Sequence, residues 1–178
     1  LYYLKNGEET TIEDVMSIIK WPDFPTGGMI YDPENILEVY RKGKWSIVVR
    51  GKTHIEPSKS KWGDSIVITE IPYQVNKASL VEKIGDLVMD KKLEGITDVR
   101  DESARNEIRV VIQLSNKVNT ERMLAKLLKM TPLQTTFSLN NVSLVHQWKQ
   151  PRLLNILDMV SEFVIYRREV VYRRSVFQ

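Results

Sequence analysis

The sequence has 178 residues, 42% hydrophobic and 28% charged, which is enough to bury a core and argues against disorder. Its 26 lysines and arginines exceed its 23 acidic residues by three, so a polyanionic partner is allowed but not established. The lack of cysteine excludes disulfides and thiolate metal sites, and the two histidines, His54 and His146, have no ligand-spaced partner. Without a long apolar run or a signal segment, we expect a soluble intracellular protein.

The first 64 residues predict short elements around an irregular segment. Thr10 and Glu13 have the spacing of a capping box, and apolar residues at helical spacing follow until Pro22 ends the pattern. Two prolines and two glycines make residues 22–28 irregular. We then expect a helical turn over 34–40, a strand or hairpin arm over 44–55, and a polar loop over 57–63.

From Ser65 the pattern becomes regular and predicts the order β-α-β-β-α-β. Each of the two helices has one apolar stripe, which fits two helices packed on one side of a four-stranded sheet. This is the ferredoxin-like arrangement of the α+β class. The expected elements are a strand over 66–71, a helix over 77–92, strands over 96–100 and 108–114, a helix over 120–130 and a strand over 135–145.

The last part predicts a long helix or the start of a coiled coil. After Pro151, apolar residues recur near heptad spacing, and Glu169 lies four residues before Arg173 as a supporting pair. The second half carries a dense basic face made of Arg167, Arg168, Arg173 and Arg174. This face is either a phosphate-facing stripe or the polar side of a partnered helix. Because the chain opens at Leu1 and closes at Gln178 inside the helical pattern, we expect it to be a piece of a longer protein.

Two candidate ligand sites are better explained without a ligand. Residues 51–53 resemble the end of a phosphate-binding loop, but Ser46 stands where that motif needs its first glycine. Asp98, Asp101 and Glu102 could hold a hard cation, yet acidic residues are common in turns, where we expect this segment to lie. We therefore predict neither a phosphate-binding loop nor a metal site.

A basic group with an aromatic residue among its members has the composition of a nucleic-acid surface. Its members are Arg41, Lys42, Lys44, Trp45, Arg50 and Lys52. A solvated strand face explains the same charges equally well. A tyrosine nucleophile toward a phosphodiester needs a general base or metal and a nearby cation, and none of the seven tyrosines follows an arginine. We expect no active nucleophile.

Two other classes share the β-α-β-β-α-β order. An RNA-recognition module stacks bases on aromatic residues of its central strands, but the strand over 108–114 has none, so this alternative is weak. A non-catalytic regulatory domain that binds a small molecule stays open. The long helix that follows argues against it.

Five motifs, in order along the chain, resemble the DNA gyrase A subunit family of type IIA DNA topoisomerases. They are Pro22–Gly28, Ile71–Lys77, Glu94–Ile96 with Arg100–Ser103, Thr131–Gln134, and Arg167–Val171 with Arg173–Arg174. Together they extend over almost the whole chain. The runs at 74–77 and 131–134 resemble the gyrase branch more than topoisomerase IV, which is the alternative within the family.

The resemblance implies a tower domain that ends in the first stretch of a coiled coil leading to the exit gate. It divides the chain into residues 1–64 as the N-terminal part of the tower, 65–146 as its ferredoxin-like core, and 147–178 as the start of the coiled coil. It also implies an ATP-dependent parent enzyme whose catalytic tyrosine lies outside this chain. No cofactor is expected here, because Mg and ATP are used by the gyrase B subunit.

The resemblance implies a supporting role in holding bent double-stranded DNA during strand passage and supercoiling. The implied DNA-binding residues are Arg41, Lys42, Lys44, Arg50 and Lys77. The implied partners are the gyrase B subunit, in a heterotetramer, and a second copy of the A subunit, in a homodimer, without a membrane. The expected location is the bacterial cytoplasm on the chromosome, with an organelle as the alternative. Trp21 and Trp45 stand where the family usually has glycine, and residues 146–150 replace a tight turn.

Overall fold

The computed structural model describes residues 2–20, 22–31, 34–58, 63–105, 107–145 and 150–177. The chain forms two compact units, each built from separated stretches. The first contains residues 1–22, 32–47 and 137–178, and the second contains 23–31 and 48–136. The boundaries fall inside strands β2 (Lys44–Arg50) and β7 (Gln134–Asn140). The division into residues 1–64, 65–146 and 147–178, which the resemblance implies, stays a prediction.

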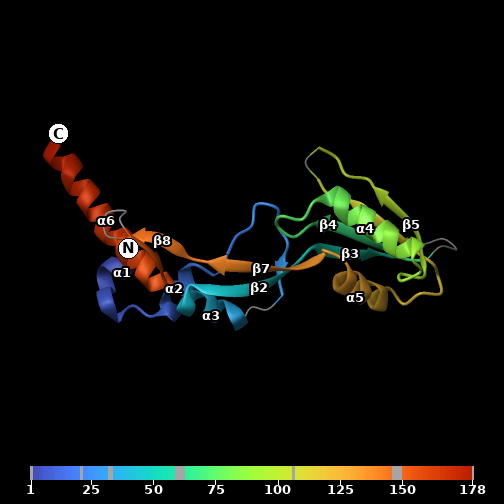
Figure 1. Cartoon of the computed structure of the whole chain (residues 1–178), viewed down its shortest axis with the longest axis horizontal. Helices are drawn as coiled ribbons and strands as arrows, with labels where there is room; N and C mark the ends of the chain where they lie inside the picture. The colour runs from blue at the N-terminus through green and yellow to red at the C-terminus, as the bar shows by residue number, and fades with distance from the viewer. Residues whose placement is uncertain are drawn as a thin grey trace. The chain divides into compact units, whose positions relative to one another are not determined.

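The second unit contains a four-stranded antiparallel sheet in the order β3-β4-β6-β5 (Figure 1). The strands are β3 (Lys52–Glu56), β4 (Ser65–Glu70), β6 (Val110–Leu114) and β5 (Ile96–Asp101). Helices α4 (Lys77–Met89) and α5 (Thr120–Met130) pack their apolar stripes against alternate residues of these strands. Both helices therefore cover one face. The core includes Ile66, Ile68, Leu80, Ile84, Ile112, Leu114 and Leu127.

The predicted α+β class and the two helices on one sheet face are confirmed. The predicted membership of the sheet is wrong in one strand. The edge position beside β4 is filled by β3, whereas β7 belongs to the sheet β1-β2-β7, in which β1 is Met29–Ile30. Gly51 alone separates β2 from β3, and a Cβ there would lie 2.7 Å from the Glu70 carbonyl oxygen. Because no side chain fits, glycine lets the chain pass from one sheet into the other at this point.

Asparagine side chains begin the two helices of the second unit. Asn76 accepts a hydrogen bond from the Ser79 amide at 3.2 Å, and Asn119 accepts one from the Arg122 amide at 2.9 Å. These caps satisfy amide groups that have no partner inside the helix. Local sequence therefore sets the first residue of each helix.

The first unit contains α1 (Tyr2–Asn6), a 3-10 turn (Gly7–Glu9), α2 (Ile12–Ile18) and α3 (Glu34–Lys42). It also contains the hairpin of β8 (Val142–Val145) and β9 (Gln150–Leu153), followed by α6 (Ile156–Phe177). Its buried side chains include Val15, Ile36, Val39, Tyr40, Ile47, Val145 and Leu154. None of the helices among the described residues is long and apolar enough to cross a membrane.

Two predictions in the first unit need correction. The capping box uses Thr11 and Asp14, one residue later than predicted, because the Thr10 side chain is buried. The strand predicted over 135–145 is divided at Asn141, whose amide donates to the Gly43 carbonyl and whose carbonyl accepts from the Leu154 amide. These hydrogen bonds between distant residues end β7 and start β8. Pairing of β8 with β9 was not predicted.

Candidate nucleic-acid interface

Three of the predicted DNA-binding residues, Arg41, Lys42 and Lys44, lie together at the junction of α3 and β2 in the first unit. Gly43 makes the junction possible: its φ of +67° ends the helix, and its amide donates to the Val39 carbonyl at 2.9 Å. A Cβ on Gly43 would lie 2.1 Å from the Leu154 carbonyl oxygen, so no other residue fits there without a shift. The junction therefore presents its three cations on a fixed backbone.

Carboxylates compensate part of this positive charge. Arg41 lies 2.9 Å from Glu13 and 3.7 Å from Glu38, and Lys42 lies 2.8 Å from Glu38. Hydrogen bonding from Lys42 lowers the pKa of Glu38 below its usual range. Lys44 has no carboxylate within ion-pair distance among the residues that the structure describes. The junction thus retains one net positive charge, with Lys44 as its most available cation.

Trp45 follows Lys44 and contributes an aromatic surface to the junction. The Lys42 ammonium lies 4.5 Å from the centroid of a Trp45 ring, and the Trp45 residue is 37% exposed. A groove of about 690 Å³ opens beside it, lined by Lys44, Trp45, Ser46, Ser138, Leu139 and Asn140. A cation next to an exposed ring and hydroxyl groups can contact both phosphate and sugar. Trp21 and residues 146–149, the other places where the chain departs from the family pattern, lie outside the described residues.

The other two predicted DNA-binding residues, Arg50 and Lys77, belong to the second unit. The guanidinium carbon of Arg50 lies 3.2 Å from the centroid of the Tyr31 ring, and its Nε donates to Gln134 Oε1 at 2.5 Å. Lys77, at the start of α4, lies 2.7 Å from Asp101 and helps to lower the pKa of that carboxyl to about 2. Lys77 is therefore neutralised locally, whereas Arg50 is held by uncharged groups.

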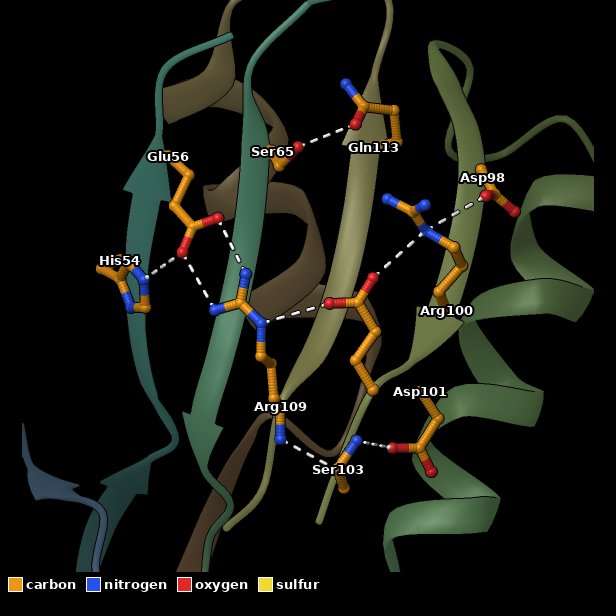
Figure 2. Close-up of polar contacts among 10 residues, drawn as sticks. His54, Glu56, Ser65, Asp98, Arg100, Asp101, Ser103, Arg109 and Gln113 are labelled. Atoms are coloured by element: carbon orange, nitrogen blue, oxygen red, sulfur yellow. Dashed lines mark hydrogen bonds and ion pairs between the residues drawn. The ribbon is translucent and has the colours of Figure 1, made fainter.

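The face of the four-stranded sheet turned away from α4 and α5 carries a network of ion pairs (Figure 2). Arg109 donates to both carboxylate oxygens of Glu56, at 3.0 and 2.9 Å, and to Glu102 at 3.2 Å. Arg100 lies 3.4 Å from Asp98 and 3.6 Å from Glu102. These charges compensate one another within the face, so it offers little net charge to a polyanion.

The same network gives a structural role to the acidic group considered as a metal site. Asp98 lies within β5, which agrees with the predicted strand over 96–100, and Glu102 lies in the connection to β6. Asp101 is the last residue of β5, so the predicted turn location is wrong for this residue. Each of the three pairs with Arg100, Arg109 or Lys77. Among the described residues there is no cluster of three or more His, Asp or Glu that could hold a metal ion.

The arginine-rich half of α6 lies beside an apolar groove. Arg167 and Arg168 line it together with Tyr3 and Leu4 of α1 and with apolar residues of α6. Phe163, one of these, is 64% exposed. Arg173 pairs with Glu169, as predicted. Cations next to an apolar groove fit the polar side of a partnered helix better than a phosphate-facing stripe.

Sequence reasoning missed Tyr31 and Gln134 as neighbours of Arg50. Gln134 lies 84 positions from Arg50 in the chain, and no local pattern connects the two residues. By its sequence context, Tyr31 is only a flanking core or surface aromatic. The arrangement could be found only once β1, β2 and β7 were placed in one sheet.

Comparison with known proteins places the whole chain in one family. Residues 1–178 match the family model for the A subunit of DNA gyrase/topoisomerase IV. The chain is 53% identical over 176 residues to the DNA gyrase A subunit of Neisseria gonorrhoeae, covering 98% of this chain and 19% of that protein. It is 45% identical over 175 residues to the same protein of Ureaplasma parvum, covering 98% of this chain and 20% of that protein. The chain spans about a fifth of the length of these relatives, and it belongs to the family of DNA gyrase/topoisomerase IV A subunits.

Proposed function

We propose that this chain is the tower part of a gyrase A subunit, which supports and binds the bent, cleaved DNA segment during ATP-dependent strand passage and supercoiling. The observation that carries the proposal is the match of the whole chain to gyrase A subunits, with identities of 39 to 53%. α6 is the first stretch of the coiled coil. Its exposed apolar residues support this, because a helix with such residues and no buried ones needs a partner.

Holding DNA bent requires positive charge near its arms, since bending brings phosphates closer together. Arg41, Lys42 and Lys44 supply such charge in the first unit, and Trp45 adds contact surface. Of these, Lys44 contributes most, because Glu13 and Glu38 already engage its two neighbours. In the second unit Arg50 is the stronger candidate, because Lys77 is paired with Asp101.

The chemistry of cleavage belongs to another part of the enzyme. The buried Tyr40 has its pKa raised by desolvation, which disfavours the phenolate that attack on phosphorus requires. In the proposed assembly the gyrase A subunit forms a homodimer and joins two B subunits, which use Mg and ATP. The complex works on the chromosome in the bacterial cytoplasm.

The proposal is tested by replacing Arg41, Lys42 and Lys44 together with glutamine in the A subunit that carries this chain. Each phosphate interaction removed should reduce the slope of log K against log salt concentration by about 0.9 for duplex DNA. The existing pairs with Glu13 and Glu38 make the reduction smaller than that for three full phosphate interactions. Binding to a duplex of about 40 base pairs across a salt series measures it.

A control variant with Lys83, Lys126 and Lys129 replaced by glutamine removes the same charge from the exposed surfaces of α4 and α5. The proposal predicts a larger change in slope for the junction variant than for this control. Equal slopes in both variants would mean that net charge alone matters and would exclude the junction from the DNA-binding surface.

A further inference from the structure

We propose that Arg50, held by Tyr31 and Gln134, is a preorganised clamp for one phosphate of the DNA backbone. This inference rests on the proposed function and adds a specific interaction with a defined geometry. All three residues belong to the second unit, so the site is complete within it.

The guanidinium of Arg50 is fixed in two directions. Its guanidinium carbon lies over the Tyr31 ring, 3.2 Å from the ring centroid. Its Nε donates to Gln134 Oε1 at 2.5 Å, which sets the rotation of the plane. A free arginine loses considerable side-chain entropy when it binds an anion, and here the protein has already ordered it.

The backbone that carries Arg50 is also fixed. Arg50 pairs with Met29 of β1 in the sheet, and the following Gly51 donates its amide to the Leu133 carbonyl at 2.8 Å. A Cβ on Gly28, which has a φ of +96°, would lie 3.0 Å from the Arg50 carbonyl oxygen. The backbone is thus closely packed on both sides of Arg50, which holds the Cα position of this residue fixed.

No carboxylate neutralises Arg50 within the described part of the chain. Glu70 accepts hydrogen bonds from the Gly28 amide at 2.6 Å and from Lys52 at 3.3 Å, and the former lowers its pKa. Arg50 forms no ion pair within the described ranges, unlike Arg41 and Arg109. Its two terminal nitrogens have no hydrogen-bond partner among the same residues. Within the part of the chain that the structure describes, Arg50 therefore keeps its full positive charge, and its two terminal nitrogens are available as hydrogen-bond donors.

Two terminal nitrogens of a planar guanidinium match two non-bridging oxygens of a phosphodiester, with two parallel N–H···O hydrogen bonds. Tyr31 is 58% exposed and Arg50 is half-buried, so solvent reaches the pair from one side and such a ligand can approach there. A lysine at the same position could offer only a single point charge. This difference makes the clamp distinguishable from a general electrostatic attraction.

The test compares Arg50→Lys and Arg50→Gln in the whole A subunit that carries this chain, with binding to a duplex across a salt series. Arg50→Gln should lower affinity by about 10-fold and reduce the salt slope by about 0.9, since it removes one charge-assisted interaction with a phosphate. Arg50→Lys should keep most of the slope but still lose several-fold in affinity. Tyr31→Leu and Gln134→Leu should weaken binding while leaving the slope nearly unchanged, because the charge remains.

Lys52→Gln is the matched control, since it removes a neighbouring cation that is already paired with Glu70. It should change affinity less than Arg50→Gln does. If the unaltered A subunit does not bind duplex DNA, the proposed function fails. If it binds steeply and Arg50→Lys binds equally well, the proposed function survives and the clamp is overturned. Unchanged duplex binding by both Arg50 variants, with saturable binding of inorganic phosphate that needs Arg50, would assign a free anion and also overturn it.

Discussion

At the scale of single residues, Glu56 should make the stability of the fold depend on pH. It lies on the face of the four-stranded sheet that is turned away from α4 and α5 (Figure 2). Hydrogen bonds from Arg109 and then His54 lower the pKa of this carboxyl from 4.5 to about 2. Because the pKa of Glu56 is lower in the folded protein, its charged form stabilises the fold fully at pH values above the ordinary pKa of 4.5. This contribution is lost as the pH falls through the folded pKa of about 2. Thermal unfolding followed between pH 4.5 and pH 2 should therefore show a modest loss of stability as the pH falls.

Glu56→Gln should flatten that dependence, because the variant has no carboxylate to protonate at this position. The effect is modest and should shrink at high salt, since the Arg109 and Glu56 side chains are 39% and 42% exposed. Glu107→Gln, which removes an exposed carboxylate with no ion pair among the described residues, serves as the control. Identical pH profiles for Glu56→Gln and the unaltered protein would contradict this account.

Two glycines should respond to alanine in opposite directions. At Gly43 the φ of +67° and a Cβ only 2.1 Å from the Leu154 carbonyl oxygen predict a loss of at least about 2 kcal/mol in unfolding free energy. At Gly85, inside α4, a Cβ meets nothing within 4 Å, so alanine should stabilise by about 0.5–1 kcal/mol. Urea denaturation measures both changes. Unchanged stability of the Gly43→Ala variant would contradict the close packing of Gly43 against the Leu154 carbonyl group.

At the scale of elements, the packing of α5 on the sheet should dominate the stability of the second unit. Leu127 is fully buried in the core, whereas Leu124 is only partly buried on the same helix. Leu127→Ala should cost about 2–5 kcal/mol, because it removes apolar packing and leaves a cavity. Leu124→Ala should cost clearly less in the same denaturation experiment. A reversed order would mean that α5 packs through a different face.

Elements defined by local signals could be predicted from the sequence, and their partners could not. The helix predicted over 120–130 has the observed bounds, since the Asn119 cap and the apolar stripe are both local. The strand beginning near Gln134 was also found, but its sheet was not. An alternating pattern shows which face of a strand is buried and says nothing about which neighbour it pairs with. By pattern, either β3 or β7 could be the edge strand beside β4. Gly51 lets the chain pass from β2 into β3, and β3 then fills the edge position.

At the scale of the whole molecule, some features of the candidate site could be predicted from the sequence and others could not. Arg41, Lys42 and Lys44 lie within four positions of one another, so their proximity follows from the sequence alone. The partial neutralisation of Arg41 by Glu13 spans 28 positions and could not be predicted. The stack of Arg50 on Tyr31 likewise requires the pairing of β1 with β2. The sequence shows which residues carry positive charge. Only the tertiary structure shows which of these charges are paired with a carboxylate.

The central claim is that this part of the gyrase A subunit binds duplex DNA through its own basic surface. The most direct test is binding of the 178-residue chain itself to a duplex of about 40 base pairs across a salt series. The account predicts binding at low salt, with log K falling linearly against log salt concentration and a shallower slope when Arg41, Lys42 and Lys44 are replaced by glutamine. Absence of binding at low salt, or binding that does not respond to salt, would contradict it.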